Sequence, residues 1–301
     1  MPPPRGSYNP IEGPGDYDTT TVVHDDSYPA IDPLKANFHG KAVLVTGASR
    51  GLGRAMSVSF AKAGASMIAI AARGDLSTTA EVVKAEAAKA GRPEPKVLPL
   101  QFDVSDIKGA EQAAAKVKEV FGRMDIVINN AGVLGQGLVA DTDPEEWWKI
   151  WRINLFGPYL VARAFIPLLL EGGEKTIVNV SSVGAHCIVP GMSAYQTAKL
   201  AVLRLSEFIS AEYGDKGLLT YNIHPGNIKT DLVGGAALDA EFLKVFTETA
   251  QLSGDSLVYL TSEKRDWLAG RYINVTWDLP ELVAMKEDIV EKDKLKVRIV
   301  L

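Results

Sequence analysis

The 301-residue sequence contains a single cysteine, Cys187. An intrachain disulfide needs two cysteines, so no disulfide framework holds this chain together, and one cysteine is typical of a reducing compartment. The only histidines are His24, His39, His186 and His224. They are scattered without the spacing of metal ligands, so the sequence predicts no metal site.

A strong charge bias and long apolar runs are also absent. The net charge is -5 and no basic stripe stands out, which excludes nucleic acid as the predicted partner. Uninterrupted apolar runs such as Phe165–Leu170 are too short to span a bilayer. The first residues lack the apolar core of a secretory signal. We therefore expect a cytoplasmic protein without a membrane partner.

The composition changes along the chain and predicts three parts. Residues 1–37 are rich in Pro, Gly, Asp and Ser without periodicity, which predicts an extended or disordered extension, more simply a tail than a binding arm. Residues 38–276 are long enough for one large α/β domain. Residues 277–301 are charged and helix-prone, which predicts a peripheral tail, placed at a subunit interface.

Between these ends, short apolar runs alternate with helical patterns. The predicted strands are Lys41–Thr46, Ser66–Ala71, Lys96–Gln101, Met124–Asn129, Thr176–Val180, Leu218–His224 and Tyr272–Val275. The predicted helices are Gly53–Ala63, Thr78–Ala90, Ile107–Phe121, Pro144–Glu171, Ala194–Tyr213 and Ser253–Leu260. Strands of this kind are buried on both faces. The pattern predicts a doubly wound, Rossmann-type α/β fold: a seven-stranded parallel sheet with helices on both faces in a single domain.

Local signals mark several element ends. Asp143 before Pro144 predicts a helix start, and the segment from Thr78 to Glu81 matches a capping box. Gly91 and Gly122 stand where helix C-caps are expected. Residues 233–250 contain glycines followed by an amphipathic run, which predicts a mobile substrate flap.

The first strand runs into Thr46-Gly-Ala-Ser-Arg-Gly-Leu-Gly53, and a helix follows. Glycines let this backbone turn sharply and approach a pyrophosphate, which then lies at the helix N-terminus. The spacing differs from the GxGxxG of other dinucleotide folds. The segment between a strand and a helix therefore predicts a dinucleotide site.

Four further signatures follow in order. They are Asn129-Asn130-Ala131-Gly132, Asn154, Ser182 with Tyr195-x3-Lys199, and Pro225-Gly226. With the glycine loop, they make the chain from about Lys41 to Val275 resemble the classical short-chain dehydrogenases/reductases. The extension and the charged tail resemble fungal members that tailor secondary metabolites. The resemblance implies an oxidoreductase that acts on CH–OH groups with a nicotinamide cofactor.

NADP(H) is favoured over NAD(H) as this cofactor. An NAD enzyme ends its second strand with an acid, whereas this chain has Arg73 there and Arg50 in the glycine loop. Asp75 remains an alternative acid, although it follows Gly74 beyond the strand. The predicted cofactor contacts are Gly47, Ser49, Arg50, Gly51, Leu52, Gly53, Arg73, Asp103, Val104, Asn130, Ala131, Gly132, Tyr195, Lys199, Pro225, Gly226, Ile228 and Thr230.

Tyr195 and Lys199 lie one helical turn apart, where an ammonium can lower the pKa of a phenol. The resemblance makes Tyr195 the general acid/base and Lys199 the group that lowers its pKa and binds ribose. The resemblance also implies that Ser182 donates a hydrogen bond to the substrate oxygen and that Asn154 holds a water molecule of a proton relay. The neighbouring Ser181 is expected to support the backbone.

The predicted reaction is hydride transfer between nicotinamide and a carbonyl or secondary alcohol, with a ketone of an apolar small metabolite as the expected substrate. The alternatives are a non-redox cofactor-binding scaffold, and a non-redox cyclase or dehydratase on the same fold. The resemblance implies a homodimer or homotetramer.

Overall fold

The structure is a computed structural model that describes residues 16–230 and 242–299. The strands are β1 (Ala42–Thr46), β2 (Met67–Ala72), β3 (Lys96–Gln101), β4 (Ile126–Asn129), β5 (Thr176–Val180), β6 (Leu219–His224) and β7 (Tyr272–Asn274). The helices are α1 (Gly51–Lys62), α2 (Ser77–Lys89), α3 (Ile107–Phe121), α4 (Pro144–Trp151), α5 (Gly157–Glu171), α6 (Ser193–Tyr213), α8 (Ala250–Thr261), α9 (Leu279–Ala284) and α10 (Lys286–Glu291). Each predicted strand is confirmed, with ends that shift by at most two residues.

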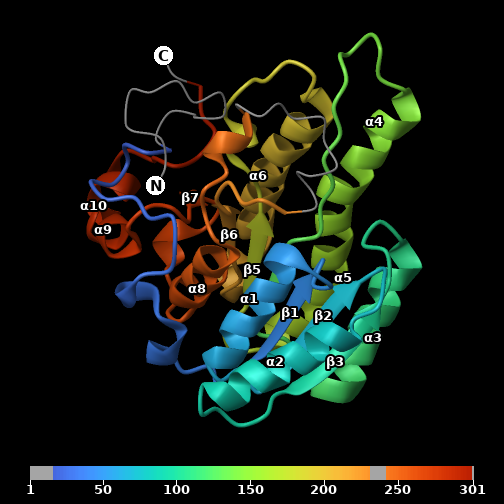
Figure 1. The fold of residues 1–301 in the computed structure, drawn as a ribbon, viewed down its shortest axis with the longest axis vertical. Coiled ribbons are helices and arrows are strands. Elements are labelled where there is room, and N and C mark those ends of the chain that lie inside the picture. Colours follow the sequence, from blue (N-terminus) through green and yellow to red (C-terminus); the bar gives the residue numbers. More distant parts are fainter. Residues whose placement is uncertain (1–15, 231–241, 300–301) are drawn as a thin grey trace.

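All seven strands are parallel and lie in the order β3-β2-β1-β4-β5-β6-β7 (Figure 1). The order reverses between β1 and β4, because β1 continues to β2 on one side and β4 continues to β5 on the other. In such sheets a ligand binds at the carboxyl ends of the strands beside the reversal. The glycine loop follows β1, and the Asn129–Gly132 segment follows β4 at the same edge. The doubly wound fold is confirmed.

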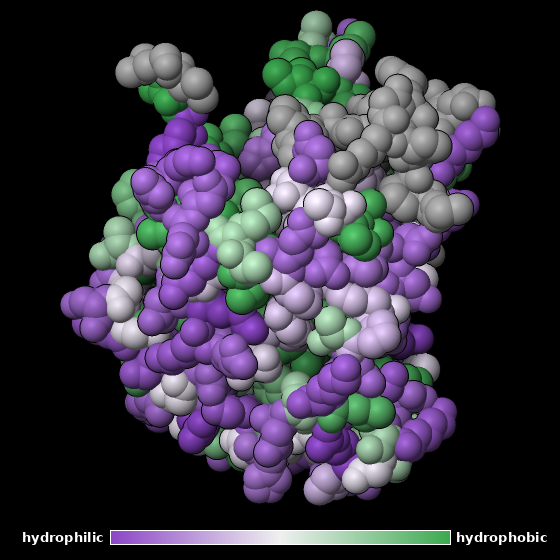
Figure 2. All heavy atoms as spheres, turned by 90° about the vertical axis from the view of Figure 1, so that its left-hand side faces the viewer, coloured by the Kyte–Doolittle hydropathy of each residue, from purple (hydrophilic) through white to green (hydrophobic). Residues whose placement is uncertain are grey.

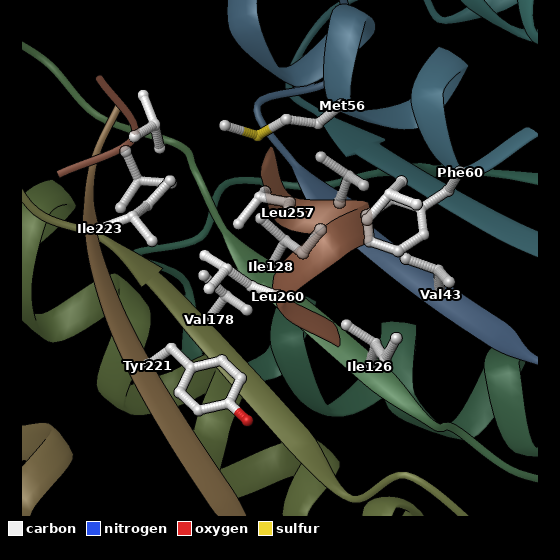
Figure 3. Packing of buried hydrophobic residues seen from close by; sticks show 14 of the residues in the cluster. Val43, Met56, Phe60, Ile126, Ile128, Val178, Tyr221, Ile223, Leu257 and Leu260 are labelled. Atoms are coloured by element: carbon white, nitrogen blue, oxygen red, sulfur yellow. The ribbon is translucent and has the colours of Figure 1, made fainter. Parts of the chain in front are cut away.

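Residues of the central strands face two separate hydrophobic cores, one on each side of the sheet. Val43 and Val45 of β1 pack with α1, α2 and α8, whereas Leu44 packs with α3 and α5. Figure 3 shows the first core, in which Met56 of α1 and Leu257 of α8 meet the inner strands. Burial on both faces explains why these strands read as continuous apolar runs rather than alternating ones.

The helix starts follow the predicted signals in one case and not in another. The Asp143 side chain accepts hydrogen bonds from the backbone of Glu145 and Glu146, as expected for the start of α4. The capping box at Thr78 is wrong, because α2 already begins at Ser77. Thr79 is buried instead and donates from Oγ1 to the Ala48 carbonyl at 3.0 Å. Its hydroxyl therefore supports the glycine loop.

The predicted long helix Pro144–Glu171 is interrupted by a π-helical turn, Arg152–Phe156. By length and composition this stretch is long and apolar enough to cross a membrane, which counting uninterrupted apolar runs did not reveal. However, 61% of its most apolar part is buried, and Val161 and Phe165 pack against the sheet. In the described part of the chain, this stretch therefore packs as part of the protein core.

The two terminal segments pack against the catalytic domain's own core. Ile31 from the N-terminal segment and Trp277, Leu279 and Ile289 from the C-terminal one join the core beside α8. Val23 forms an antiparallel bridge with Trp277. The boundaries predicted at 37/38 and 276/277 therefore do not separate independent parts. The outer surface on the side of α9 and α10 is mainly hydrophilic (Figure 2), because Leu279, Leu282 and Ile289 are buried in their own chain, although Val290 is exposed.

Residues 233–241 of the predicted flap lie outside the described residues. The remainder of the flap is part of the framework. Val245 is buried against Val183, and the Thr249 side chain accepts a hydrogen bond from Leu252 N at the start of α8. The carboxyl-terminal end of the predicted flap is thereby attached to the sheet's helical layer.

Candidate active site

The glycine loop approaches the segment after β4 so closely that side chains are excluded. A Cβ atom on Gly53 would lie 2.3 Å from the Gly47 carbonyl oxygen. Gly47 itself has φ +68°, and its Cβ would lie 2.9 Å from the Ala131 Cα. Neither position can hold a larger residue without moving backbone. The loop is thus a cradle in which backbone N–H groups at the start of α1 can face a phosphate.

A groove runs from this loop along the carboxyl ends of the strands to Lys199 and Thr230. All the predicted cofactor contacts line it except Asp103 and Gly226. The Asp103 carboxylate accepts hydrogen bonds from Ser105 N and Oγ at 2.8 and 2.7 Å, which turns it toward its own loop. Gly226 lines the neighbouring pocket instead. The groove and its glycine cradle fit a dinucleotide.

The Asn129–Gly132 segment is fixed by hydrogen bonds to the end of β1. Asn130 N and Ala131 N donate to Thr46 Oγ1 at 3.0 and 3.1 Å. Asn130 Nδ2 donates to the Thr46 carbonyl at 2.9 Å. These bonds hold the two sides of the groove together at the point where the strand order reverses.

Ser182, Tyr195 and Lys199 come together where β5 ends against α6. Ser182 and Tyr195 line the same pocket, and the Ser182 side chain lies close enough to the Tyr195 hydroxyl to affect its pKa. Lys199 Nζ lies 5.6 Å from the Tyr195 ring centroid and donates to the Val180 carbonyl at 2.8 Å. Ser181 Oγ donates to the Lys199 carbonyl at 3.1 Å, which is the backbone support expected of it. The geometry presents a serine and a tyrosine hydroxyl to one point, with a buried ammonium beneath.

Burial dominates the ionisation of this group. It lowers the pKa of Lys199 to about 8, so the ammonium remains mostly protonated at pH 7. Burial raises the pKa of Tyr195, and the nearby Ser182 side chain partly opposes this. The expectation that Lys199 sets a lowered tyrosine pKa is not met in this geometry, since the ammonium is directed to the Val180 carbonyl and desolvation is the larger effect.

Asn154 lies in the π-helical turn, a feature that is frequent at functional sites. Its Nδ2 donates to the carbonyls of Val133 and Ile150 at 2.8 and 2.9 Å, and its Oδ1 accepts from Val133 N at 3.3 Å. A Cβ on Gly132 would lie 2.9 Å from Asn154 Oδ1 and 3.7 Å from Lys199 Nζ. Asn154 and Lys199 therefore both lie close to Gly132.

A second, mainly apolar pocket adjoins Ser182 and Tyr195. Its apolar walls include Leu134, Val183, Val189, Met192, Ile228 and Phe246. Cys187 lines it, whereas His186 packs edge-on against Tyr272, with ring centroids 4.4 Å apart. Burial raises the pKa of the Cys187 thiol, which disfavours a nucleophilic thiolate. The pocket can hold the apolar body of a substrate next to the two hydroxyls.

His224 is also part of this wall. Its Nδ1 accepts a hydrogen bond from Val183 N at 3.1 Å, so the neutral ring carries its proton on Nε2. Burial lowers the pKa of His224 to about 3, which keeps the ring neutral at physiological pH. The ring thereby holds the turn that follows Ser182.

Glu248 was missed by the sequence analysis, because an isolated glutamate carries no pattern. It is buried, and its Oε2 accepts from Asn227 N at 2.9 Å beside Gly226. Gly226 has φ +89°, and its Cβ would lie 3.1 Å from the Glu248 Cβ. Glycine is thus required in this turn. Glu248 connects the loop after β6 to the residues that precede α8.

Glu248→Gln should change the pH dependence of stability. Burial raises the pKa of Glu248 from 4.5 to about 7, so its contribution to stability is present below pH 4.5 and is lost as the pH rises through 7. The loss amounts to ~3 kcal/mol, at about 1.4 kcal/mol per pKa unit. Glutamine keeps an acceptor for Asn227 N without titrating. The free energy of unfolding, measured in urea, should therefore decrease less between pH 5 and pH 8 in the variant than in wild type. Glu119→Gln, at an exposed position of α3, should behave as wild type.

Two arginines lie at the end of the groove that contains the glycine loop. Arg73 is exposed after β2, with Nη1 3.8 Å from Asp103 Oδ2, and Arg50 is exposed on the glycine loop. Asp75 is directed elsewhere. Its carboxylate accepts hydrogen bonds from Ser77 N and Oγ at the start of α2, which lowers the pKa of Asp75.

The groove at the strand reversal and the Ser–Tyr–Lys group beside it define a nucleotide-dependent oxidoreductase. A family model for short chain dehydrogenases matches residues 41–240. The chain is 59% identical to short chain dehydrogenase pigC of Monascus ruber over the whole of both chains, and 49% identical to short chain dehydrogenase citE of Monascus ruber over 93% of this chain and 95% of that one. A gluconate 5-dehydrogenase from Burkholderia cenocepacia, solved with NADP and tartrate, superposes with a TM-score of 0.72 at 25% identity over 84% of this chain and 99% of its own.

The chain belongs to the short-chain dehydrogenase family. It is an oxidoreductase that acts on CH–OH groups and binds a nicotinamide cofactor. The resemblance stated from the sequence is confirmed, including the likeness to fungal members of the family.

Proposed function

We propose that the enzyme reduces the ketone of an apolar small metabolite with NADPH, in fungal secondary metabolism. The observation that carries this proposal is the mainly apolar pocket whose lining includes both Ser182 and Tyr195. A bound nicotinamide supplies the hydride. A carbonyl placed there can accept a hydrogen bond from Ser182 while Tyr195 supplies the proton.

The remaining residues support this proton transfer. Lys199 keeps a positive charge next to the tyrosine, because a pKa of about 8 leaves it mostly protonated at neutral pH. Asn154 holds the backbone of Val133 and lies next to Lys199 beside Gly132, where an ordered water would complete a path to solvent. A non-redox scaffold would use the cofactor groove but would not need this relay, and a cyclase or dehydratase would not need a hydride donor.

The preference for NADP(H) follows from the charges at the ribose end of the groove. Arg73 and Arg50 are exposed there, and a planar guanidinium pairs well with a 2′-phosphate. Asp75, the remaining candidate for an NAD-type acid, is occupied by Ser77.

We also propose a cytoplasmic homodimer or homotetramer. Large apolar side chains remain exposed on α4, the π-helical turn, α5 and α6: Trp148, Phe156, Tyr159, Leu200 and Phe208. Apolar surface of this kind is typical of subunit contacts. Light scattering of the purified protein measures the mass directly.

The free thiol of Cys187 fits a reducing compartment.

A panel of aryl and alkyl ketones, followed at the NADPH absorbance, tests the proposed reaction. We expect turnover of bulky apolar ketones, with a higher kcat/KM for NADPH than for NADH. Conversion of a substrate by enzyme free of nicotinamide would instead establish a cyclase or dehydratase. Absence of turnover with the entire panel in both directions would contradict the proposal.

A further inference from the structure

The N-terminal segment reaches the back of the substrate pocket. Asp16 and Tyr17 are buried, although they precede the first strand by more than 20 residues in the sequence. The Asp16 carbonyl accepts from Trp277 Nε1 at 3.0 Å and from Asn274 Nδ2 at 3.3 Å. The Tyr17 hydroxyl accepts from Asn227 Nδ2 at 3.3 Å. A segment remote in sequence thus contacts a residue of the pocket wall.

Asn227 is held from two sides. Its backbone N–H donates to Glu248 Oε2 at 2.9 Å, and its side-chain amide donates to Tyr17. It is 6% exposed and lines the pocket that contains Ser182 and Tyr195. A buried amide with a fixed orientation loses little conformational entropy when a ligand binds, and such preorganisation favours binding.

The Asn227 side chain also has a hydrogen-bond acceptor, Oδ1. Among the residues that the structure describes, none donates a hydrogen bond to Asn227 Oδ1. Asn227 lines the pocket, and an amide oxygen there can accept a hydrogen bond from a bound ligand. Because the pocket walls around it are mainly apolar, a hydroxyl donor on the substrate is the chemical group that this oxygen fits.

We propose that Asn227 recognises a hydroxyl group of the substrate and that Tyr17 is the residue that positions it. The substrate class is therefore an apolar ketone that carries a second, hydrogen-bonding hydroxyl away from its carbonyl. This inference rests on the proposed ketone reduction and adds a specificity determinant to it. Tyr17 acts through Asn227 and is a positioning residue, not a catalytic one.

The segment is anchored independently of Tyr17. Ser27 Oγ donates to Asp255 Oδ2 of α8 at 2.6 Å, and the Tyr28 hydroxyl accepts from Leu279 N at 2.8 Å. Val23 pairs with Trp277 between these contacts and Tyr17. Removal of the Tyr17 hydroxyl alone should therefore leave the segment in place, so that Tyr17→Phe tests positioning rather than folding.

The experiment compares 2-acetylnaphthalene with 6-hydroxy-2-acetylnaphthalene, two ketones that differ by one hydroxyl. We expect wild type to prefer the hydroxylated ketone by about tenfold in kcat/KM, the value of one hydrogen bond of about 1.4 kcal/mol. Tyr17→Phe and Asn227→Leu should bring the ratio close to one, mainly through KM of the hydroxylated ketone. Tyr28→Phe, a hydroxyl removed from the same segment, should keep the wild-type ratio.

Melting temperatures and NADPH binding by fluorescence accompany the kinetics. If Tyr17→Phe lowers kcat/KM equally for both ketones, its role is structural and the inference is wrong. Wild-type turnover of both ketones without a preference would overturn this inference and leave the proposed reaction intact. Turnover of neither ketone, nor of any other in the panel, removes the proposed function and the inference with it.

Discussion

Tyr195→Phe should reduce turnover by about a thousandfold while the protein still binds NADPH. The phenol lines the pocket together with Ser182 and is placed to donate a proton to a bound carbonyl, and general acid catalysis contributes about 10²- to 10⁴-fold. Phenylalanine keeps the ring that packs beside Lys199 and removes only the hydroxyl. Single-turnover kinetics with the best ketone of the panel, together with NADPH fluorescence titration, separates the chemical step from binding.

The same helix provides the matched control. Tyr213 is the last residue of α6, where its ring contacts Lys216, far along the helix from the site. Tyr213→Phe should keep the wild-type rate. If Tyr195→Phe retains more than about a tenth of the wild-type turnover, another residue supplies the proton and the assignment of Tyr195 is wrong.

The sequence predicted those parts of the fold that depend on local pattern. Strands buried on both faces have apolar runs, and the run from Thr176 to Val180 is matched to the residue. The glycine loop was equally predictable, because Gly47 and Gly53 stand where the backbones of two loops meet. At such positions chain geometry restricts the residue type, so the pattern can be recognised without knowledge of the partner.

What escaped prediction depends on partners far away in the sequence. Tyr17 and Asn227 are 210 residues apart, and neither belongs to a motif. The composition of residues 1–37 suggested a tail without function, yet Ile31 is buried in the main core. Polar, proline-rich composition reports how little apolar surface a segment has. It does not report whether a complementary groove exists elsewhere on the chain.

A local signal can also be overruled by packing. The segment from Thr78 to Glu81 has the letters of a capping box, but Thr79 is buried under the glycine loop. There its hydroxyl accepts from Arg54 Nε at 3.0 Å, and Arg54 in turn donates to the Ser49 carbonyl. The threonine supports the cofactor cradle, a demand from tertiary structure that a four-residue pattern cannot reveal.

The double variant Arg50→Ala/Arg73→Ala should lower kcat/KM for NADPH by about a hundredfold or more and leave that for NADH nearly unchanged. Each arginine that pairs with a 2′-phosphate contributes a charge-assisted hydrogen bond of about 1.5–3 kcal/mol, and 1.4 kcal/mol corresponds to tenfold. NADH has a hydroxyl at this position and loses little. Both side chains are exposed beside the groove, so their removal should not disturb the core.

Steady-state kinetics with each cofactor at several salt concentrations measures the effect. Wild-type KM for NADPH should rise with salt, because exposed ion pairs are screened, and the double variant should lose most of that dependence. Arg163→Ala removes an exposed arginine that pairs with Glu111 outside the groove, and it should match wild type with both cofactors. A wild-type preference for NADH, or an equal loss with both cofactors in the double variant, would assign these arginines to the shared part of the dinucleotide. Asp75 would then be the candidate ligand of the ribose 2′-hydroxyl. Its carboxylate lines the groove with Arg73 and would become available if its hydrogen bonds from Ser77 were broken.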